Sequence, residues 1–273
     1  MSELKVWFLG LAATAATAFL CWLASLARRD VSLIDRVWSL MFVSAALAYA
    51  IGGRAAPARV GLVMVPLLAW ALRLALHLTA RNWGHGEDRR YRKIRDSHEP
   101  GFPFKSLYIV FAPQALLAWI ISLPLLGTMR GSNLPGWRDL PGLVLWLAGF
   151  SIEVIADRQL TRFRAQPANR GAVMDRGLWR YSRHPNYFGE CCLWWGFYLL
   201  ALAAGAWWTI VAPLLMTVLL LRVSGVTLLE QDIAERRPGY QDYVARTSAF
   251  ILRAPRRPQS VTAARAGSSA HPR

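Results

Sequence analysis

This chain contains six long apolar stretches, which constrain its fold more than any other feature. The first has 22 residues without a charge, enough for one helix to cross the roughly 30 Å hydrocarbon core of a bilayer. The last has 31 uncharged residues. One helix of that length would rise about 46 Å, too far for a single crossing, so Gly205 near its middle predicts two helices and a tight turn. The predicted spanning segments are 6–27, 37–53, 60–80, 106–129, 140–156, 186–204 and 206–228.

The basic residues indicate which side of the membrane each connection faces. The chain has 32 Lys and Arg against 16 Asp and Glu, a net charge of +16. With seven crossings, 25 basic residues fall on one side and 5 on the other. Because cytoplasmic loops are rich in Lys and Arg, the N-terminus is predicted outside and the C-terminus in the cytoplasm. The fold class is thus an all-α integral membrane bundle of seven helices, and the charge reflects topology rather than nucleic-acid binding.

Composition supports a membrane domain and excludes several other classes. Hydrophobic residues make up 55% of the chain and charged residues 18%, unlike an ordinary soluble enzyme. We expect one membrane domain over 1–252 and a disordered basic tail over 253–273. A secretory signal peptide is the alternative for the first segment, but Lys5 is a weak basic start. The three cysteines are expected to be buried thiols, with neither a disulfide nor a metal site.

Ionisable side chains inside the predicted spans are candidates for function, because a charge in a bilayer is costly. They are Asp35, Arg36, Arg73, His77, Glu153, Asp157, Glu190 and Arg222. Glu190 lies 15 residues before Gly205 and Arg222 lies 17 residues after it. At about 1.5 Å per residue the two reach nearly the same depth in a hairpin, which predicts a Glu190–Arg222 ion pair. This pair is either a structural bridge or a group that organises a ligand.

Two predicted cytoplasmic loops, 81–105 and 157–187, are denser in polar residues than a connection needs to be. Arginines suit phosphate groups, and the first loop offers Arg89, Arg90 and Arg95. Topogenic charge on solvated loops is the alternative, but it leaves the neighbouring aromatic, Asn, His and carboxylate residues unexplained. A ligand with phosphate, base and ribose would explain them. The second loop's candidates for that ligand are Tyr181, Arg183, His184, Asn186 and Tyr187.

The second loop runs into the sequence GLWRYSRHPNYFGE over 177–190, and RPGYQDY follows at 237–243. The first loop contains Glu87-Asp88-x-Arg90-Tyr91. Together these strings resemble membrane proteins of the steroid 5α-reductase type, in the bacterial branch with an uncharacterised DUF1295-type domain. The resemblance covers roughly 35–250. The RHPNYxG core also occurs in sterol C14-reductases and isoprenylcysteine carboxyl methyltransferases, whereas the following Glu190 and the upstream Asp157 favour the 5α-reductase type.

The resemblance implies a bundle that holds NADPH in a cytoplasm-facing cavity and reduces an α,β-unsaturated ketone in a steroid or similar lipid. The family's nucleotide-contacting positions fall on Asp157, Arg164, Asn186 and Glu190. Two further positions, Glu153 and Glu230, carry residues that differ from the family's Asn and Tyr. Glu190 is expected to accept a hydrogen bond from the nicotinamide carboxamide, with Arg222 offsetting its charge. The many arginines predict a preference for NADPH over NADH.

Hydride addition to an enone builds negative charge on the ketone oxygen, so the reaction needs a proton source or hydrogen-bond donor. The predicted catalytic residues are Asp35, His77, Tyr91 and Glu190. Asp35 would serve as a protonated acid if its carboxyl is unpaired. In the alternative, Asp35 pairs with Arg36 or Arg73, and His77 hydrogen-bonds a backbone carbonyl. The Gln-Glu pair and the Tyr by which the animal enzymes hold the steroid ketone are replaced by Asp35-Arg36 and Trp70.

Two other functions compete with the reductase. The first is an S-adenosylmethionine-dependent methyltransferase of the isoprenylcysteine carboxyl type, which usually ends in Glu-Glu where this chain has Leu229-Glu230-Gln231. The second is a transporter or lipid-binding scaffold, for which an internal repeat is missing. For the reductase we expect a hydrophobic steroid or lipid substrate and membrane lipid as partners, with no nucleic acid and no obligatory protein partner. The expected location is a bacterial inner membrane or its equivalent.

Overall fold

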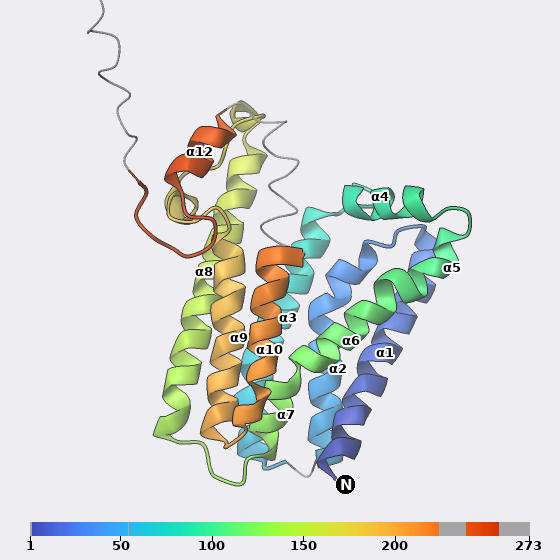
Figure 1. Ribbon diagram of the computed structural model, residues 1–273, viewed down its shortest axis with the longest axis vertical. Helices are drawn as coiled ribbons and strands as arrows, with labels where there is room; N and C mark the ends of the chain where they lie inside the picture. Colours follow the sequence, from blue (N-terminus) through green and yellow to red (C-terminus); the bar gives the residue numbers. More distant parts are fainter. Residues whose placement is uncertain (1, 54, 224–238, 257–273) are drawn as a thin grey trace, which may run out of the picture. The chain divides into compact units, whose positions relative to one another are not determined.

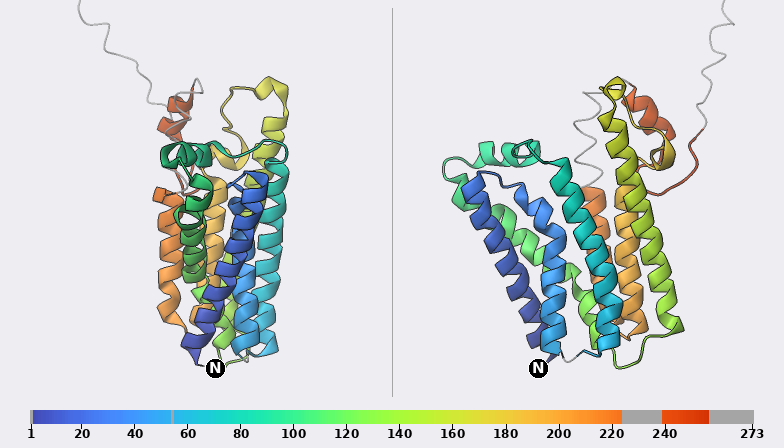
Figure 2. Two further views of the ribbon diagram at one scale, coloured as in Figure 1. Left: turned by 90° about the vertical axis from the view of Figure 1, so that its right-hand side faces the viewer. Right: turned by 180° about the vertical axis from the view of Figure 1, so that it is seen from behind.

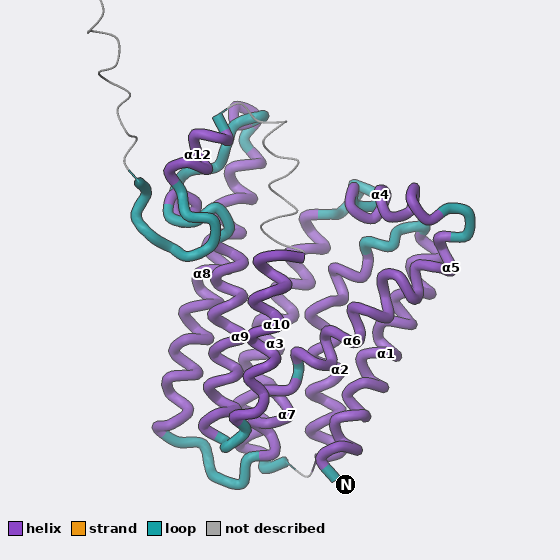
Figure 3. Tube along the Cα trace, viewed as in Figure 1, coloured by secondary structure: helices purple, strands orange, loops and turns teal. Residues whose placement is uncertain are grey.

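The computed structural model describes residues 2–53, 55–223 and 239–256, and every regular element in these ranges is a helix (Figures 1 and 3). The chain divides into two compact units. The first comprises Met1–Ser151 and Gly189–Leu219, and the second comprises Ile152–Phe188 and Leu220–Arg273. The long helices α8 (Leu140–Ala165) and α9 (Pro185–Ala203) contribute to both. The single domain expected over 1–252 stays a prediction.

The first unit is built from long apolar helices that pack side by side (Figures 1 and 2). Its N-terminal part consists of α1 (Glu3–Arg28), α2 (Leu33–Gly53) and α3 (Pro57–Arg81), and the short α4 (Arg89–His98) runs crosswise after α3. A broken helix follows as α5 (Phe102–Ser106), a π-helical turn (Leu107–Phe111), α6 (Ala112–Ile121) and α7 (Leu123–Arg130). After α9 comes α10 (Val211–Val218), which ends the first unit together with Leu219; the rest of the π-helical turn Leu219–Val223 belongs to the second unit.

Five helical stretches are long and apolar enough to cross a membrane within the described ranges. They are Glu3–Arg28, Leu33–Gly53, Pro57–Arg81, Phe102–Arg130 and Trp137–Ala165. These stretches match the first five predicted spans and fit an integral membrane protein. The count of seven and the placement of the termini stay predictions. The sixth predicted helix is present as α9, and Gly205 has φ +88°, which supplies the predicted tight turn.

Three predicted boundaries need correction. The fifth helix continues to Ala165 rather than ending at residue 156, so Asp157 and Arg164 lie on a helix and not in a loop. It continues because Phe163 and Leu160 remain on an apolar face after the membrane segment ends. The loop 81–105 contains α4, because the Asp88 carboxylate caps its first turn. Within the predicted tail, residues 253–256 are ordered by backbone hydrogen bonds, and the predicted end of the seventh helix lies outside the described residues.

Glycines let α8 and α9 approach each other backbone to backbone in the first unit. A Cβ built on Gly196 would lie 2.7 Å from Trp146 N and 2.8 Å from Gly142 O. A Cβ on Gly149 would lie 2.5 Å from Gly189 O. Small residues at such contacts are typical of packed membrane helices, where close backbone contact replaces the hydrophobic effect as the source of attraction.

A buried ion pair fixes the connection between α7 and α8. Arg59 is fully buried, and its Nη1 lies 2.7 Å from Asp139 Oδ1. The Arg59 Nε donates to Asn133 O at 3.0 Å, and Asp139 Oδ2 accepts from Gly136 N at 2.8 Å. Because both charges are hydrogen-bonded on more than one side, their desolvation is compensated. Arg59 therefore has a structural role.

Candidate functional site

The turn that leads into α9 lies in the second unit and contains the motif residues 182–187. Pro185 is the first residue of α9, where a missing N–H costs no helical hydrogen bond. Ser182 is fully buried, and its Oγ accepts from His184 N at 3.1 Å. The rings of His184 and Tyr187 stack with 5.6 Å between their centroids and 4° between their planes. The motif thus forms a fixed and largely buried turn.

Asn186, one residue into α9, reaches a carboxylate on α8. Its Nδ2 donates to Asp157 Oδ1 at 3.2 Å, and Asp157 is 7% exposed. A carboxylate only accepts hydrogen bonds, so the Asn186 amide must turn its N–H₂ towards Asp157. The other amide atom, Asn186 Oδ1, is buried and has no hydrogen-bond partner among the described residues. Because a buried acceptor without a donor is costly, this oxygen marks a position for a ligand that donates a hydrogen bond.

Further polar side chains are buried around this pair. Glu153 lies one turn before Asp157 on α8 and is 2% exposed, and His184 is 5% exposed. Polar groups are buried at this density only where they are hydrogen-bonded or bind a ligand. The sequence predicts all four of Glu153, Asp157, His184 and Asn186 as nucleotide contacts, and the structure places them in one unit.

The last turns of α8 carry three exposed arginines as well as an apolar face. Arg158, Arg162 and Arg164 are exposed. The apolar face buries Phe163 with Trp179 and other side chains in a small core of the second unit. This arrangement leaves a strongly basic helix end in the same unit as the Asp157–Asn186 pair.

Two other predicted nucleotide contacts have different surroundings. The Arg183 Nη1 donates to Val244 O at 3.0 Å and to Thr247 O at 3.3 Å, at the end of α12 (Tyr240–Arg246). A guanidinium that satisfies terminal helix carbonyls has a structural role. Tyr181 is 42% exposed, and its carbonyl accepts from Arg253 N. Contacts from both side chains to a nucleotide stay predictions.

In the first unit, Asp35 at the start of α2 accepts two hydrogen bonds from α4. Tyr91 OH donates to Asp35 Oδ1 at 2.6 Å, and Arg90 Nη2 donates to Asp35 Oδ2 at 2.8 Å. Gln114 on α6 donates through Nε2 to the Tyr91 oxygen at 3.3 Å. Asp35 is therefore an ion-pair partner of Arg90 and not an unpaired acid, while the ion pair of Arg36 is to Asp30 at 3.4 Å.

Two more carboxylates anchor α4. Asp88 Oδ1 accepts from Arg90 N at 2.9 Å, and Glu87 accepts from Val31 N at 2.9 Å. Arg95 donates to both Glu87 oxygens, at 2.8 and 2.9 Å. Burial raises the pKa of the Glu87 carboxyl, but the hydrogen bonds from Arg95 and Val31 outweigh it and bring the pKa below its usual value. Asp88 follows the same pattern. Burial raises the pKa of its carboxyl, but the hydrogen bonds and charge of Arg90 outweigh burial and bring the pKa below its usual value.

These bonds change the interpretation of the three arginines predicted to bind phosphate. Burial lowers the pKa of the Arg90 guanidinium, but the charges of Asp35 and Asp88 raise it above its ordinary value. Arg90 is thus already engaged by two carboxylates, and Arg95 is engaged by Glu87. The side chain of Arg89 is exposed. Sequence reasoning missed the anchoring role, although an acidic pair next to arginines is a usual sign of one.

Asp35 and Tyr91 are expected to act as one network. Asp35→Asn and Tyr91→Phe should each lower the free energy of unfolding by about 1–3 kcal/mol, because each removes a hydrogen bond with a charged partner. The double variant should lose clearly less than the sum of the two losses. Denaturant titration of the purified protein in detergent measures this, with Tyr108→Phe as the control because Tyr108 is 64% exposed. Additive losses would show that the two side chains act independently.

The structure does not bring the remaining predicted site residues together. His77 and Arg73 lie one turn apart on α3, both half-buried. Glu190 on α9 belongs to the first unit, Arg222 belongs to the second, and Glu230 lies outside the described residues. The Glu190–Arg222 ion pair and the catalytic roles of His77 and Glu190 therefore stay predictions.

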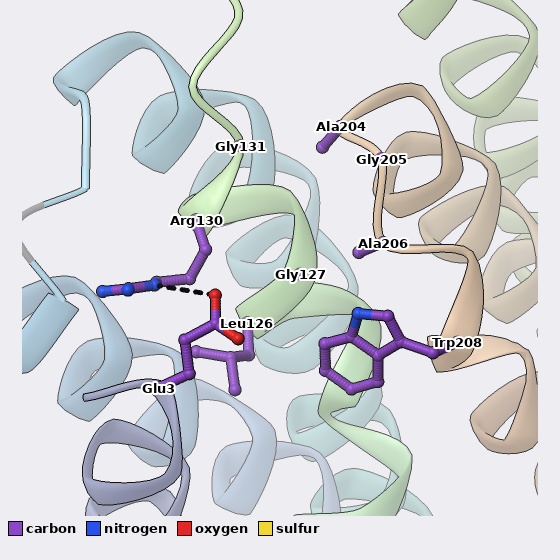
Figure 4. A pocket seen from close by; sticks show the side chains of 9 residues that line it. All are labelled: Glu3, Leu126, Gly127, Arg130, Gly131, Ala204, Gly205, Ala206 and Trp208. Atoms are coloured by element: carbon purple, nitrogen blue, oxygen red, sulfur yellow. Dashed lines mark ion pairs between the residues drawn. The ribbon is translucent and has the colours of Figure 1, made fainter.

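A pocket of about 120 Å³ opens in the first unit beside the turn at Gly205 (Figure 4). It is lined by Glu3, Leu126, Gly127, Arg130, Gly131, Ala204, Gly205, Ala206 and Trp208. Arg130 Nε lies 3.7 Å from Glu3 Oε1 across it. This volume is well below the roughly 300–1,000 Å³ of typical small-molecule sites, so the pocket is too small for a dinucleotide. None of the predicted site residues lines it.

Within the described residues the chain is all-helical, with five helices long and apolar enough to cross a membrane, and its second unit contains a buried carboxylate–amide pair as the candidate site. The chain belongs to the family described as protein of unknown function (DUF1295), which it matches over residues 21–247. This finding confirms the DUF1295 part of the resemblance.

Two known proteins are similar in sequence. An uncharacterised protein of Schizosaccharomyces pombe is 25% identical over 262 residues, covering 85% of this chain and 75% of that protein. Steroid 5-alpha-reductase DET2 of Arabidopsis thaliana is 40% identical over 62 residues, which is 22% of this chain and 23% of the plant protein. No solved structure matches the chain. These similarities are consistent with a membrane reductase in general.

Proposed function

We propose that this chain is an NADPH-dependent membrane oxidoreductase that reduces a C=C bond conjugated to a ketone in a steroid or similar lipid. The observation that carries the proposal is the buried Asn186 oxygen, held beside Asp157 and still able to accept a hydrogen bond. The family membership and the short match to a plant steroid 5-alpha-reductase support it. We place the protein in a bacterial inner membrane or its equivalent.

The residues of the second unit fit a nicotinamide nucleotide. A carboxamide N–H₂ is the kind of donor that Asn186 Oδ1 requires, and Asp157 fixes the amide so that its oxygen faces the ligand. The exposed Arg158, Arg162 and Arg164 offer bidentate donors to phosphate, including a 2′-phosphate. NADPH, when bound, supplies the hydride. The protein's part is to hold the nucleotide, to orient its carboxamide and to exclude water.

The proton for the ketone oxygen is the second requirement. Tyr91 is 7% exposed, and its one hydroxyl proton is donated to Asp35, so it would have to leave this hydrogen bond before it could donate to a substrate. Burial, followed by the charge of Asp35, raises the pKa of Tyr91 above its usual value and keeps it protonated at neutral pH. Asp35, His77, Tyr91 and Glu190 stay the predicted candidates for this proton or hydrogen-bond donor.

The cofactor preference tests this proposal. Turnover of a 3-oxo-4-ene steroid in proteoliposomes is expected to give a kcat/KM at least about tenfold higher with NADPH than with NADH, because one charge-assisted contact to the 2′-phosphate is worth about that factor. Arg164→Gln should narrow this ratio, whereas Arg138→Gln, an exposed arginine of the first unit, should not. Equal use of both nucleotides would contradict the proposal. Methyl transfer from S-adenosylmethionine without NADPH oxidation would replace it with the methyltransferase function.

A further inference from the structure

The segment 240–253 follows the membrane helices in the sequence, yet its backbone is bonded to the turn before α9. Arg183 N donates to Ser248 O at 2.8 Å, and Arg253 N donates to Tyr181 O at 3.1 Å. The Ser182 Oγ donates to Phe250 O at 2.7 Å. All of these residues lie in the second unit. Three successive residues of the turn are therefore held by one distant stretch of chain.

Tyr243 lies at the middle of this contact. Its hydroxyl donates to Trp179 O at 2.5 Å and has Ser182 O as a second acceptor at 3.3 Å. The Tyr243 side chain is 3% exposed. Burial raises the pKa of its hydroxyl above the usual value, so it remains a donor across the physiological range. One buried phenol thus ties the first and last carbonyls of the segment 179–182.

The consequence concerns the residues that come next in the chain. His184 N donates to Ser182 Oγ, and Asn186 then reaches Asp157 over 3.2 Å. A displacement of the turn by about 1 Å would take that contact outside hydrogen-bonding range. The edge-to-face contact of Phe188 with Phe250, 5.7 Å between centroids, continues the attachment along the first turn of α9.

We propose that the segment 240–253 is a positioning element of the nucleotide site and that Tyr243 is its principal positioning residue. The inference rests on the proposed function, because it is the Asn186–Asp157 pair that the segment holds in place. It makes the C-terminal segment part of the binding machinery, although none of its side chains has to touch the nucleotide. When a ligand-contacting residue loses the hydrogen bond that holds it in place, the affinity for the ligand commonly falls several-fold to a hundredfold.

The test compares Tyr243→Phe with wild type. The variant keeps the ring and removes one hydroxyl, and it should raise the KM for NADPH about tenfold, as expected for a lost hydrogen bond. The kcat at saturating NADPH should change by less than about twofold, because a saturated site is re-formed by the ligand. Tyr108→Phe, which removes an exposed hydroxyl, is the matched control.

Two further measurements separate the possible outcomes. The first is hydrogen exchange, which should become faster at the amides of Arg183 and Arg253 in Tyr243→Phe. The second compares two truncated chains: one that ends at residue 256 should keep the wild-type KM for NADPH, and one that ends at residue 239 should not. Faster exchange with an unchanged KM would overturn the positioning role and leave the proposed function intact. If wild type binds no NADPH at all, the proposed function fails, and the positioning role fails with it.

Discussion

Asn186→Asp is expected to lower NADPH affinity by about 10²–10³-fold, the largest effect of any single substitution at the site. The variant has the same shape but places a second carboxylate 3.2 Å from Asp157, which is 7% exposed. Two like charges in a buried position repel each other, and breaking a buried pair costs about 3–5 kcal/mol. The loss is measured by titrating NADPH into detergent-solubilised protein and following tryptophan fluorescence.

The exchanged pair is the control for this prediction. In Asp157→Asn combined with Asn186→Asp, an amide again donates to a carboxylate, and an oxygen at position 186 can still accept from the ligand. The double variant should recover most of the affinity that Asn186→Asp loses. If the exchange recovers nothing while the protein remains folded, the Asp157–Asn186 hydrogen bond is not what organises the site.

Gly196→Ala is expected to destabilise the helix bundle by about 3 kcal/mol. Its new Cβ would lie 2.7 Å from Trp146 N and 2.8 Å from Gly142 O, and both are backbone atoms that cannot rotate away. The helices α8 and α9 would have to separate along their contact. The folded fraction in detergent, followed by denaturant titration, reports the loss.

Gly61→Ala on α3 is the matched comparison. A Cβ at Gly61 meets nothing within 4 Å, so the substitution should leave stability unchanged or raise it by up to about 1 kcal/mol through helix propensity. If Gly196→Ala were as harmless as Gly61→Ala, the close backbone contact of α8 with α9 would be wrong.

The apolar runs predicted the first five long helices well, because helix length and hydropathy are both set by the bilayer. They predicted the end of α8 poorly. Beyond residue 156 the sequence becomes charged, and hydropathy no longer signals a helix, yet Phe163 continues its apolar face against Trp179. In the same way, α4 is stabilised by the Asp88 cap and by contacts to other parts of the chain, which no local apolar pattern reveals.

For the candidate site too, the sequence predicted some features and not others. Asp157 and Asn186 are recognisable in the sequence, and the structure brings them into contact. The partnership of Asp35 with Arg90 and Tyr91 could not be predicted, because the residues are separated by 55 and 56 positions and only the packing of α4 joins them. Tyr243 was visible within the string RPGYQDY, but its role depends on a contact 64 positions away.

Native mass spectrometry of the detergent-solubilised protein tests the central claim most directly. The wild-type chain, offered NADPH, NADH and S-adenosylmethionine in equal amounts, is predicted to retain NADPH in preference to the other two, and Asn186→Asp is predicted to retain none. Retention of S-adenosylmethionine instead of NADPH, or equal retention of NADPH by wild type and Asn186→Asp, would contradict the account.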